Sequence, residues 1–234
     1  MLALIGAMEE EVTLLRARMD GVETATHAGI TVSRGTFDGV PVVLAQCGIG
    51  KVNATICTQM LIDLYQPSRL VFSGVAGGLL PNMRPGDLVV GSHVIQYDLD
   101  ITAFGHRPGA LPGRDRMIEA DPGLVAACTQ AYDAAFDGQD NAPALMAGTI
   151  VSGDRFISDP KTLRWLQREF SALATEMEGA AVGYTCKLND VPFVVVRGLS
   201  DTAGDEAPED FSANLTRVCQ NSFQLMERLV PLVG

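Results

Sequence analysis

The chain has 234 residues, of which 47% are hydrophobic and 19% charged, a composition typical of a globular protein with a large apolar interior, and we expect one domain covering residues 1–234. The formal net charge of −11, without any cluster of Lys or Arg, argues against a nucleic acid as partner. The apolar runs are far shorter than the roughly 20 residues of a membrane-spanning helix, so we expect no membrane partner either.

Short apolar runs bounded by turn residues predict strands, and longer runs with apolar residues three and four apart predict helices. In chain order we expect strand 2–6, helix 9–19, strands 30–37 and 40–46, helix 52–65, strands 69–73 and 87–97, helix 122–136, strand 148–152, helix 160–170, a short strand at 173–174, a helix opening at 179, strand 192–201 and a final helix from about 210. This alternation predicts an α/β fold with a central, mostly parallel mixed sheet covered by helices.

Two glycine-rich segments follow predicted strands. CGIGKVNA (47–54) leads into a helix, so its backbone amides could bind an anion or a polar ligand, although a purely structural turn fits equally well. It is not a Walker loop, because Val52 stands where Ser or Thr is needed. SGVAGGL (73–79) predicts a second turn that a ligand can approach closely, but it does not match the dinucleotide-binding pattern. We expect no cofactor.

The segment ALATEMEGAAV (172–182) places Glu176 and Glu178 in an otherwise apolar setting. Burial disfavours a charged carboxylate, so the two are either structural acceptors of backbone amides or part of a functional site. Arg197 interrupts an apolar strand and needs a buried partner, for which Glu11 and Glu176 are the candidates. Glu11 itself could be only a helix-start residue.

Ligands of such sheets bind beyond the carboxyl ends of the strands. That rule gathers Glu11, the turns at 48–50 and 74–78, Phe156, residues 176–178, Arg197 and Asp201. The histidines, His27, His93 and His106, are too far apart to suggest a metal site or a nucleophile–His pair, and we expect no metal. Several acids around glycine turns instead suit cleavage of a sugar from its leaving group, which needs one proton donor and one carboxylate that activates water.

The five cysteines show no CxxC spacing and lie among apolar neighbours, which suits free thiols in a reducing compartment. The first residues, MLALIGAMEEE, lack the basic start and the cleavage site of a signal peptide. We expect a cytoplasmic protein.

Seven segments resemble the 5′-methylthioadenosine/S-adenosylhomocysteine nucleosidases of the nucleoside phosphorylase superfamily, in the same order and over nearly the whole chain. They are IGAMEEEV (5–12), CGIGKV (47–52), VAGGL (75–79), DITAFG (100–105), VSGDRFI (151–157), TEMEGAAV (175–182) and VRGLSD (196–201). The resemblance implies the fold of that superfamily and hydrolysis of the adenine N-glycosidic bond of methylthioadenosine, adenosylhomocysteine and 5′-deoxyadenosine. A small nucleoside is then the expected ligand.

The resemblance also implies roles for individual residues. Glu11 would activate the attacking water, and Asp201, oriented by Ser200, would protonate adenine at N7. Phe156 would stack on the base, and Glu178 would accept hydrogen bonds from the ribose hydroxyls. The full set that it implies for substrate binding is Ala7, Met8, Ile49, Val75, Ala76, Gly77, Phe156, Ile157, Glu176, Met177, Glu178, Arg197, Ser200 and Phe211.

In that family a neighbouring subunit completes the pocket, which implies a homodimer and places Ile101, Phe104 and His106 in the partner's site. Two positions depart from the family pattern. Val75 stands where many members have a serine that helps to hold the water, and His106 where a tyrosine is common.

Three other interpretations remain open from the sequence. A phosphorolytic enzyme of the superfamily would need a phosphate-binding arginine near the second glycine segment, where Phe72 stands instead. A nucleosidase for futalosine or aminofutalosine would use the same acids. A non-catalytic nucleoside-binding protein would be signalled by loss of Glu11 or Asp201, and both are present. Taken singly, Asp201 could also be a helix cap and Met177 a core residue.

Overall fold

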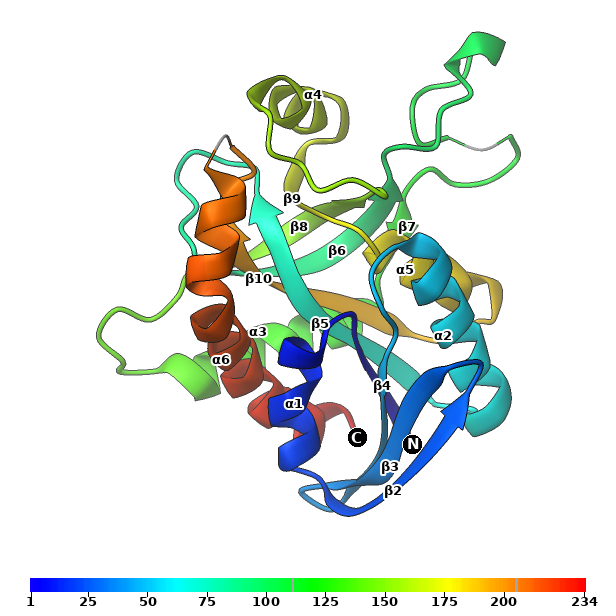
Figure 1. The fold of residues 1–234 in the computed structure, drawn as a ribbon, viewed down its shortest axis with the longest axis vertical. Helices are drawn as coiled ribbons and strands as arrows, with labels where there is room; N and C mark the ends of the chain where they lie inside the picture. The colour runs from blue at the N-terminus through cyan, green and yellow to red at the C-terminus, as the bar shows by residue number, and fades with distance from the viewer. Residues whose placement is uncertain (111, 205) are drawn as a thin grey trace.

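The computed structural model describes residues 1–110, 112–204 and 206–234. It shows a mixed β-sheet with helices on both faces (Figure 1). The elements are β1 (Leu2–Gly6), α1 (Glu9–Ala17), β2 (Asp20–His27), β3 (Ile30–Phe37), β4 (Val40–Gln46), α2 (Lys51–Tyr65), β5 (Arg69–Gly78), β6 (Leu88–Gln96), a 3₁₀ turn η1 (Thr102–Phe104), β7 (Ile118–Glu119), α3 (Pro122–Phe136), β8 (Leu145–Ser152), α4 (Pro160–Phe170), β9 (Ala172–Glu176), α5 (Gly179–Leu188), β10 (Phe193–Asp201) and α6 (Ala207–Val233).

The strands follow the order β10-β6-β8-β9-β5-β1-β4-β3-β2, and β10 also pairs with β5. Because β10 pairs with both β6 and β5, the strands β5, β9, β8, β6 and β10 form a closed ring. The strands β1 to β4 extend from β5 as an open sheet. β1 runs parallel to β4 and β5, β10 runs parallel to β5, and β6 is antiparallel to β10. The carboxyl ends of β1, β5 and β10 therefore lie at the same edge.

Alternate residues of the central strands face two separate cores. Leu4, Val71 and Val196 pack in one core with Leu225 and Leu229 of α6, and α1 and α3 cover the same face. On the other face, Ile5, Phe72 and Val195 pack with Leu61 of α2 and Val182 of α5. Each such fully buried side chain stabilises the fold by about 1.5–3 kcal/mol. The predicted α/β class and helix-covered mixed sheet are confirmed.

Most predicted elements are present; one predicted turn is a strand, and the strands β2 and β7 were not predicted. The glycine-rich segment 73–79 was predicted as a turn, but it continues β5 as far as Gly78, paired to β9 and β10. Its glycines allow close approach, since a Cβ at Gly77 would lie 2.9 Å from Asp201 Oδ1. The strand β2 was not predicted because its residues are almost all exposed and its few apolar ones, Val22 and Ala25, do not alternate.

Within the described part of the chain, none of the helices combines the length and the apolar character that crossing a membrane would require.

Candidate active site

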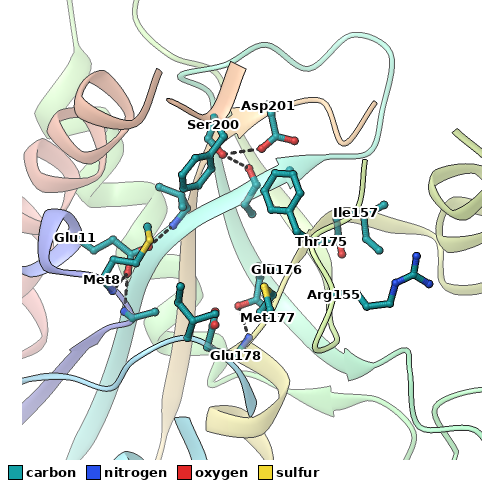
Figure 2. Close-up of a pocket in the computed structure, with 17 residues that line it drawn as sticks. Met8, Glu11, Arg155, Ile157, Thr175, Glu176, Met177, Glu178, Ser200 and Asp201 are labelled. Carbon is teal, nitrogen blue, oxygen red and sulfur yellow. Dashed lines mark hydrogen bonds between the residues drawn. The ribbon is translucent and has the colours of Figure 1, made fainter. Parts of the chain in front are cut away.

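A pocket of about 620 Å³, including its part open to solvent, lies where the ends of β1, β5, β9 and β10 meet (Figure 2). Its walls come from seven separate segments of the chain. They comprise Ala7, Met8, Glu11, Ile49, Val75, Ala76, Gly77, Arg155, Phe156, Ile157, Thr175, Glu176, Met177, Glu178, Ser200, Asp201 and Phe211.

Glu11 is held at the start of α1 by backbone N–H groups. Its Oε2 accepts from Ala7 (2.6 Å) and Met8 (3.0 Å), and its Oε1 accepts from Val75 (2.9 Å). Glu11 is therefore both the helix-start residue that the sequence allowed and a wall of the pocket. Burial raises the pKa of its carboxyl, while Arg197 and the three amides oppose that rise. A carboxylate fixed in this way can accept a proton without moving.

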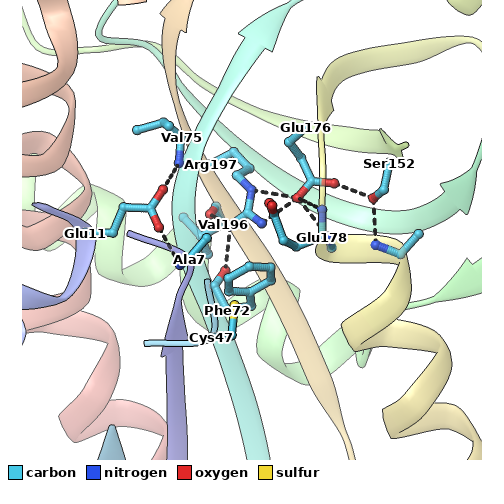
Figure 3. Close-up of polar contacts among 12 residues, drawn as sticks. Ala7, Glu11, Cys47, Phe72, Val75, Ser152, Glu176, Glu178, Val196 and Arg197 are labelled. Carbon is cyan, nitrogen blue, oxygen red and sulfur yellow. Dashed lines mark hydrogen bonds and ion pairs between the residues drawn. The ribbon is translucent and has the colours of Figure 1, made fainter. Parts of the chain in front are cut away.

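Beneath the pocket, Glu176 forms a buried ion pair with Arg197 (Figure 3). Arg197 Nη2 lies 2.5 Å from Glu176 Oε2, and the two side chains are 1% and 2% exposed. Glu176 also accepts from the Ser152 hydroxyl and from Gly179 N at 2.7 Å. The Arg197 guanidinium stacks on the Phe72 ring, 3.9 Å from its centroid. Of the two partners considered for Arg197, the structure selects Glu176.

Glu178 is placed differently although it is only two residues away. Its Oε1 accepts from Gly50 N at 2.7 Å, so the turn 48–50 does present an amide to an anion, one that belongs to the same chain. Gly50 has a φ of 96°, which an L side chain would rarely adopt. Burial and the charge of Glu176 raise the pKa of Glu178 to about 8, against the pull of Arg197 and of the Gly50 amide.

Asp201 ends β10 on a different wall from Glu11 (Figure 2). Its Oδ2 accepts from the Ser200 hydroxyl at 2.8 Å and its Oδ1 from Ala203 N at 2.7 Å. The side chain is buried, and this burial raises the pKa of the carboxyl while the two donors oppose the rise. A carboxyl with a raised pKa keeps its proton closer to neutral pH and can serve as a general acid.

Two aromatic rings form the outer wall of the pocket. Phe156 is 46% exposed and meets Phe211, from the first turns of α6, edge to face at a centroid distance of 5.9 Å. Ile157 is buried beside them. This apolar wall offers a stacking surface for a planar base.

The structure brings nearly all of the expected same-chain site residues together around the pocket. Arg197 is the exception, because it lies below the pocket wall on Glu176. Ile101, Phe104 and His106 lie on the segment around η1, outside this chain's own pocket, and Phe104 is 81% exposed.

Sequence reasoning missed two pocket residues, Thr175 and Arg155. Strand alternation would not have found Thr175, because it adjoins Glu176 in β9 and yet both residues line the pocket at the end of the strand. Arg155 adjoins Phe156 within a segment already singled out.

Known proteins resemble this chain over nearly its whole length. The family model described as "Phosphorylase superfamily" matches residues 1–231. A 5′-methylthioadenosine/S-adenosylhomocysteine nucleosidase of Geobacillus kaustophilus (strain HTA426) is 43% identical over 225 residues, which cover 96% of this chain and 94% of the relative.

Two solved structures show the same fold. The 5′-methylthioadenosine/S-adenosylhomocysteine nucleosidase of Neisseria meningitidis, in complex with methylthio-immucillin-A, superposes with a TM-score of 0.93 at 35% identity, covering 98% of this chain and 97% of the other. The futalosine hydrolase of Helicobacter pylori strain 26695 gives 0.92 at 32% identity, covering 99% and 97%. The chain belongs to the phosphorylase superfamily and, within it, to the 5′-methylthioadenosine/S-adenosylhomocysteine nucleosidases.

Proposed function

We propose that this protein hydrolyses the bond between adenine N9 and ribose C1′ in 5′-methylthioadenosine and S-adenosylhomocysteine, and also in 5′-deoxyadenosine. The observation that carries the proposal is the presence of two carboxyls with raised pKa values, the half-buried Glu11 and the buried Asp201, on different walls of one apolar pocket. The relatives named for this activity support the choice of substrate.

Asp201 is the general acid in this proposal. It gives its proton to N7 of adenine, so the electron pair of the breaking C1′–N9 bond can move into a ring system that is becoming neutral. The Ser200 hydroxyl and Ala203 N–H hold the carboxyl in one orientation and stabilise the carboxylate that is left.

Glu11 is the general base. It takes a proton from the water whose oxygen forms the new bond to C1′, after which solvent must return a proton to Asp201 and remove one from Glu11. The Val75 backbone N–H fixes Glu11 directly, so a side-chain hydroxyl at position 75 is not required to orient this base. The positive charge that develops on the sugar suits a site whose wall carries several carboxyls.

The remaining walls bind the two halves of the substrate. Glu178 accepts the 2′ and 3′ hydroxyls, with Met177 against the sugar face. Phe156 stacks on adenine, and the Ile157 backbone hydrogen-bonds its edge. Phe211 covers the base from α6.

Phosphorolysis is the weaker alternative on electrostatic grounds. Four acidic residues, Glu11, Glu176, Glu178 and Asp201, line the pocket. Of the arginines near it, Arg155 is exposed at the outer wall beside Phe156, and the guanidinium of Arg197 is already paired with Glu176. The expected arginine position holds Phe72, which is fully buried. A phosphate anion would therefore meet repulsion where it would need a cationic clamp.

The deciding assay measures adenine release from methylthioadenosine with and without phosphate. We expect release at the same rate in both. Release that strictly requires phosphate would overturn hydrolysis, and no release from any thioadenosine would indicate a binding protein. Because one structural neighbour is a futalosine hydrolase, aminofutalosine belongs in the same assay as the second candidate substrate.

We also propose that the protein is a homodimer in which Ile101, Phe104 and His106 reach the partner's pocket. The support is that Phe104 (81% exposed) and Val52 (68% exposed) leave large apolar surfaces in contact with water in one chain. The five cysteines are free and buried, which suits the reducing environment of a cytoplasmic location.

A further inference from the structure

We propose that Lys51, Asp98 and Asp154 form a positioning network that holds the adenine-binding loop and the sugar-binding Glu178 in fixed relative places. This inference deepens the proposed function and rests on the assignment of Phe156 to the base and of Glu178 to the sugar. None of the three network residues lines the active-site pocket, so any effect on ligand binding must pass through the segments that they hold.

The start of α2 binds two carboxylates that come from different parts of the chain. Its capping position is Gly50, which has no side chain to accept hydrogen bonds from the first turn. Instead, Gly50 N donates to Glu178 at 2.7 Å, and Lys51 N donates to Asp154 Oδ1 at 2.9 Å. The positive end of the helix dipole favours both carboxylates. One turn of backbone thus contacts both the sugar-binding and the base-binding segments.

The side chain of Lys51 joins these contacts into the positioning network. Its Nζ lies 2.5 Å from Asp98 Oδ1 and 3.7 Å from Asp154 Oδ2. Asp98 Oδ2 in turn accepts from Asp154 N at 3.0 Å. Asp154 is therefore held through its carboxylate by α2 and through its amide by Asp98, and the single positive charge of Lys51 is shared between the two acids.

The positioning network lies next to the base-binding wall and fixes the position of Phe156. Asp154 precedes Phe156 by two residues, and Arg155 N bonds Gly153 O at 2.8 Å in the same tight turn. The side chains of Lys51, Asp98 and Asp154 are 17%, 25% and 50% exposed, so solvent screens their ion pairs and limits what they add to stability. Their role is therefore to fix geometry, to which ligand binding is more sensitive.

The test measures adenine binding by calorimetry for Lys51→Met, Asp154→Asn and the double variant. Adenine lacks the sugar and cannot contact Glu178, so it reports on the base-binding loop alone. We expect each single change to weaken adenine binding about tenfold. The double variant should lose no more adenine affinity than one single variant, because either single change already breaks the network. Lys51→Arg, which keeps a cation, should stay within about threefold of the wild type. With methylthioadenosine, KM should rise by more than the adenine Kd, because the start of α2, whose Gly50 N–H holds Glu178, is then less firmly fixed to the base-binding loop.

The matched control is Arg18→Met, which removes another 2.5 Å ion pair, to Asp38, far from the pocket. It should leave adenine binding unchanged. Adenine affinity within about twofold of the wild type for folded Lys51→Met and Asp154→Asn, or additive losses in the double variant, would overturn the network. If Lys51→Met does not fold by circular dichroism, Asp98→Asn replaces it with the same expectation. A wild type that binds adenine but cleaves no thioadenosine would refute the proposed function and leave this test valid.

Discussion

The buried carboxylates fall into two groups that the fold treats differently. Glu176 lines the pocket and is paired with Arg197, which lies below the wall, at 2.5 Å. Glu11, Glu178 and Asp201 are held by backbone N–H groups and, for Asp201, by the Ser200 hydroxyl. Burial raises the pKa of each of these three. Arg197 occupies the carboxylate of Glu176 in an ion pair, whereas the hydrogen-bond donors around the other three leave them able to exchange protons or bind ligand hydroxyls.

The largest effect should come from breaking the Glu176–Arg197 ion pair. Arg197→Met leaves Glu176 buried without its cation, and we expect a loss of about 3–5 kcal/mol in the free energy of unfolding, measured with urea. The double variant with Glu176→Gln should recover part of that loss, because it removes both charges. If Arg197→Met is as stable as the wild type, the ion pair is not what holds the site from below.

The second prediction concerns Glu178, which is held by a backbone N–H, and the pH dependence of the free energy of unfolding. The folded-state pKa of Glu178, about 8, lies above its ordinary value of 4.5, so the folded protein holds this proton more tightly than the unfolded chain does. Wild-type stability should therefore decrease between about pH 4.5 and 8 relative to Glu178→Gln, and the difference should level off above pH 8 at the order of a few kcal/mol. Urea unfolding of both proteins across this range checks it. A constant difference at all pH values would mean that Glu178 is not strained by its burial.

Proton transfer should depend on the two carboxyls on different walls. Glu11→Gln and Asp201→Asn keep the size of each side chain and its acceptor oxygen, and each should lower the rate of adenine release by roughly two orders of magnitude or more. Circular dichroism confirms that the variants are folded. Unchanged rates in folded protein would refute these roles, and Glu176 or Glu178 would then have to be reconsidered as proton-transfer groups.

The smallest effect should come from the orientation of Asp201. Ser200→Ala removes one hydrogen bond to its carboxylate while Ala203 N remains. A bond of this kind contributes about 1 kcal/mol, so kcat should fall roughly fivefold while KM hardly changes. A fall as large as that of Asp201→Asn would show instead that the serine takes part in proton transfer.

The sequence allowed much of the fold to be predicted, because strands such as β1 and β10 are continuous apolar runs and helices such as α3 follow a helical apolar pattern. The prediction failed where a residue pattern has a cause other than the secondary structure that it usually indicates. The glycines after Ser73 mark close packing against Asp201 and Leu199 rather than a turn, and both causes favour the same residue. β2 lacks apolar alternation because it lies at the exposed end of the sheet.

For the site, sequence reasoning found the acidic residues but could not assign each of them its partner and its position. Glu176 and Glu178 look alike in the sequence, and only the register of β9 beside β8 and the position of Gly50 show which one meets Arg197 and which faces the pocket. The partner of Arg197 could not be chosen either, because Glu11 and Glu176 reach the same region from distant parts of the chain. Contacts of this kind depend on how the sheet closes through β5 and β10, which local patterns do not encode.

The most direct test of hydrolysis is the identity of the sugar product formed from methylthioadenosine in phosphate buffer, read by mass spectrometry and ³¹P NMR. The account predicts free 5-methylthioribose together with adenine, and an unchanged phosphate signal. Accumulation of 5-methylthioribose 1-phosphate would contradict it, because the pocket's carboxylates would then have admitted phosphate in place of water.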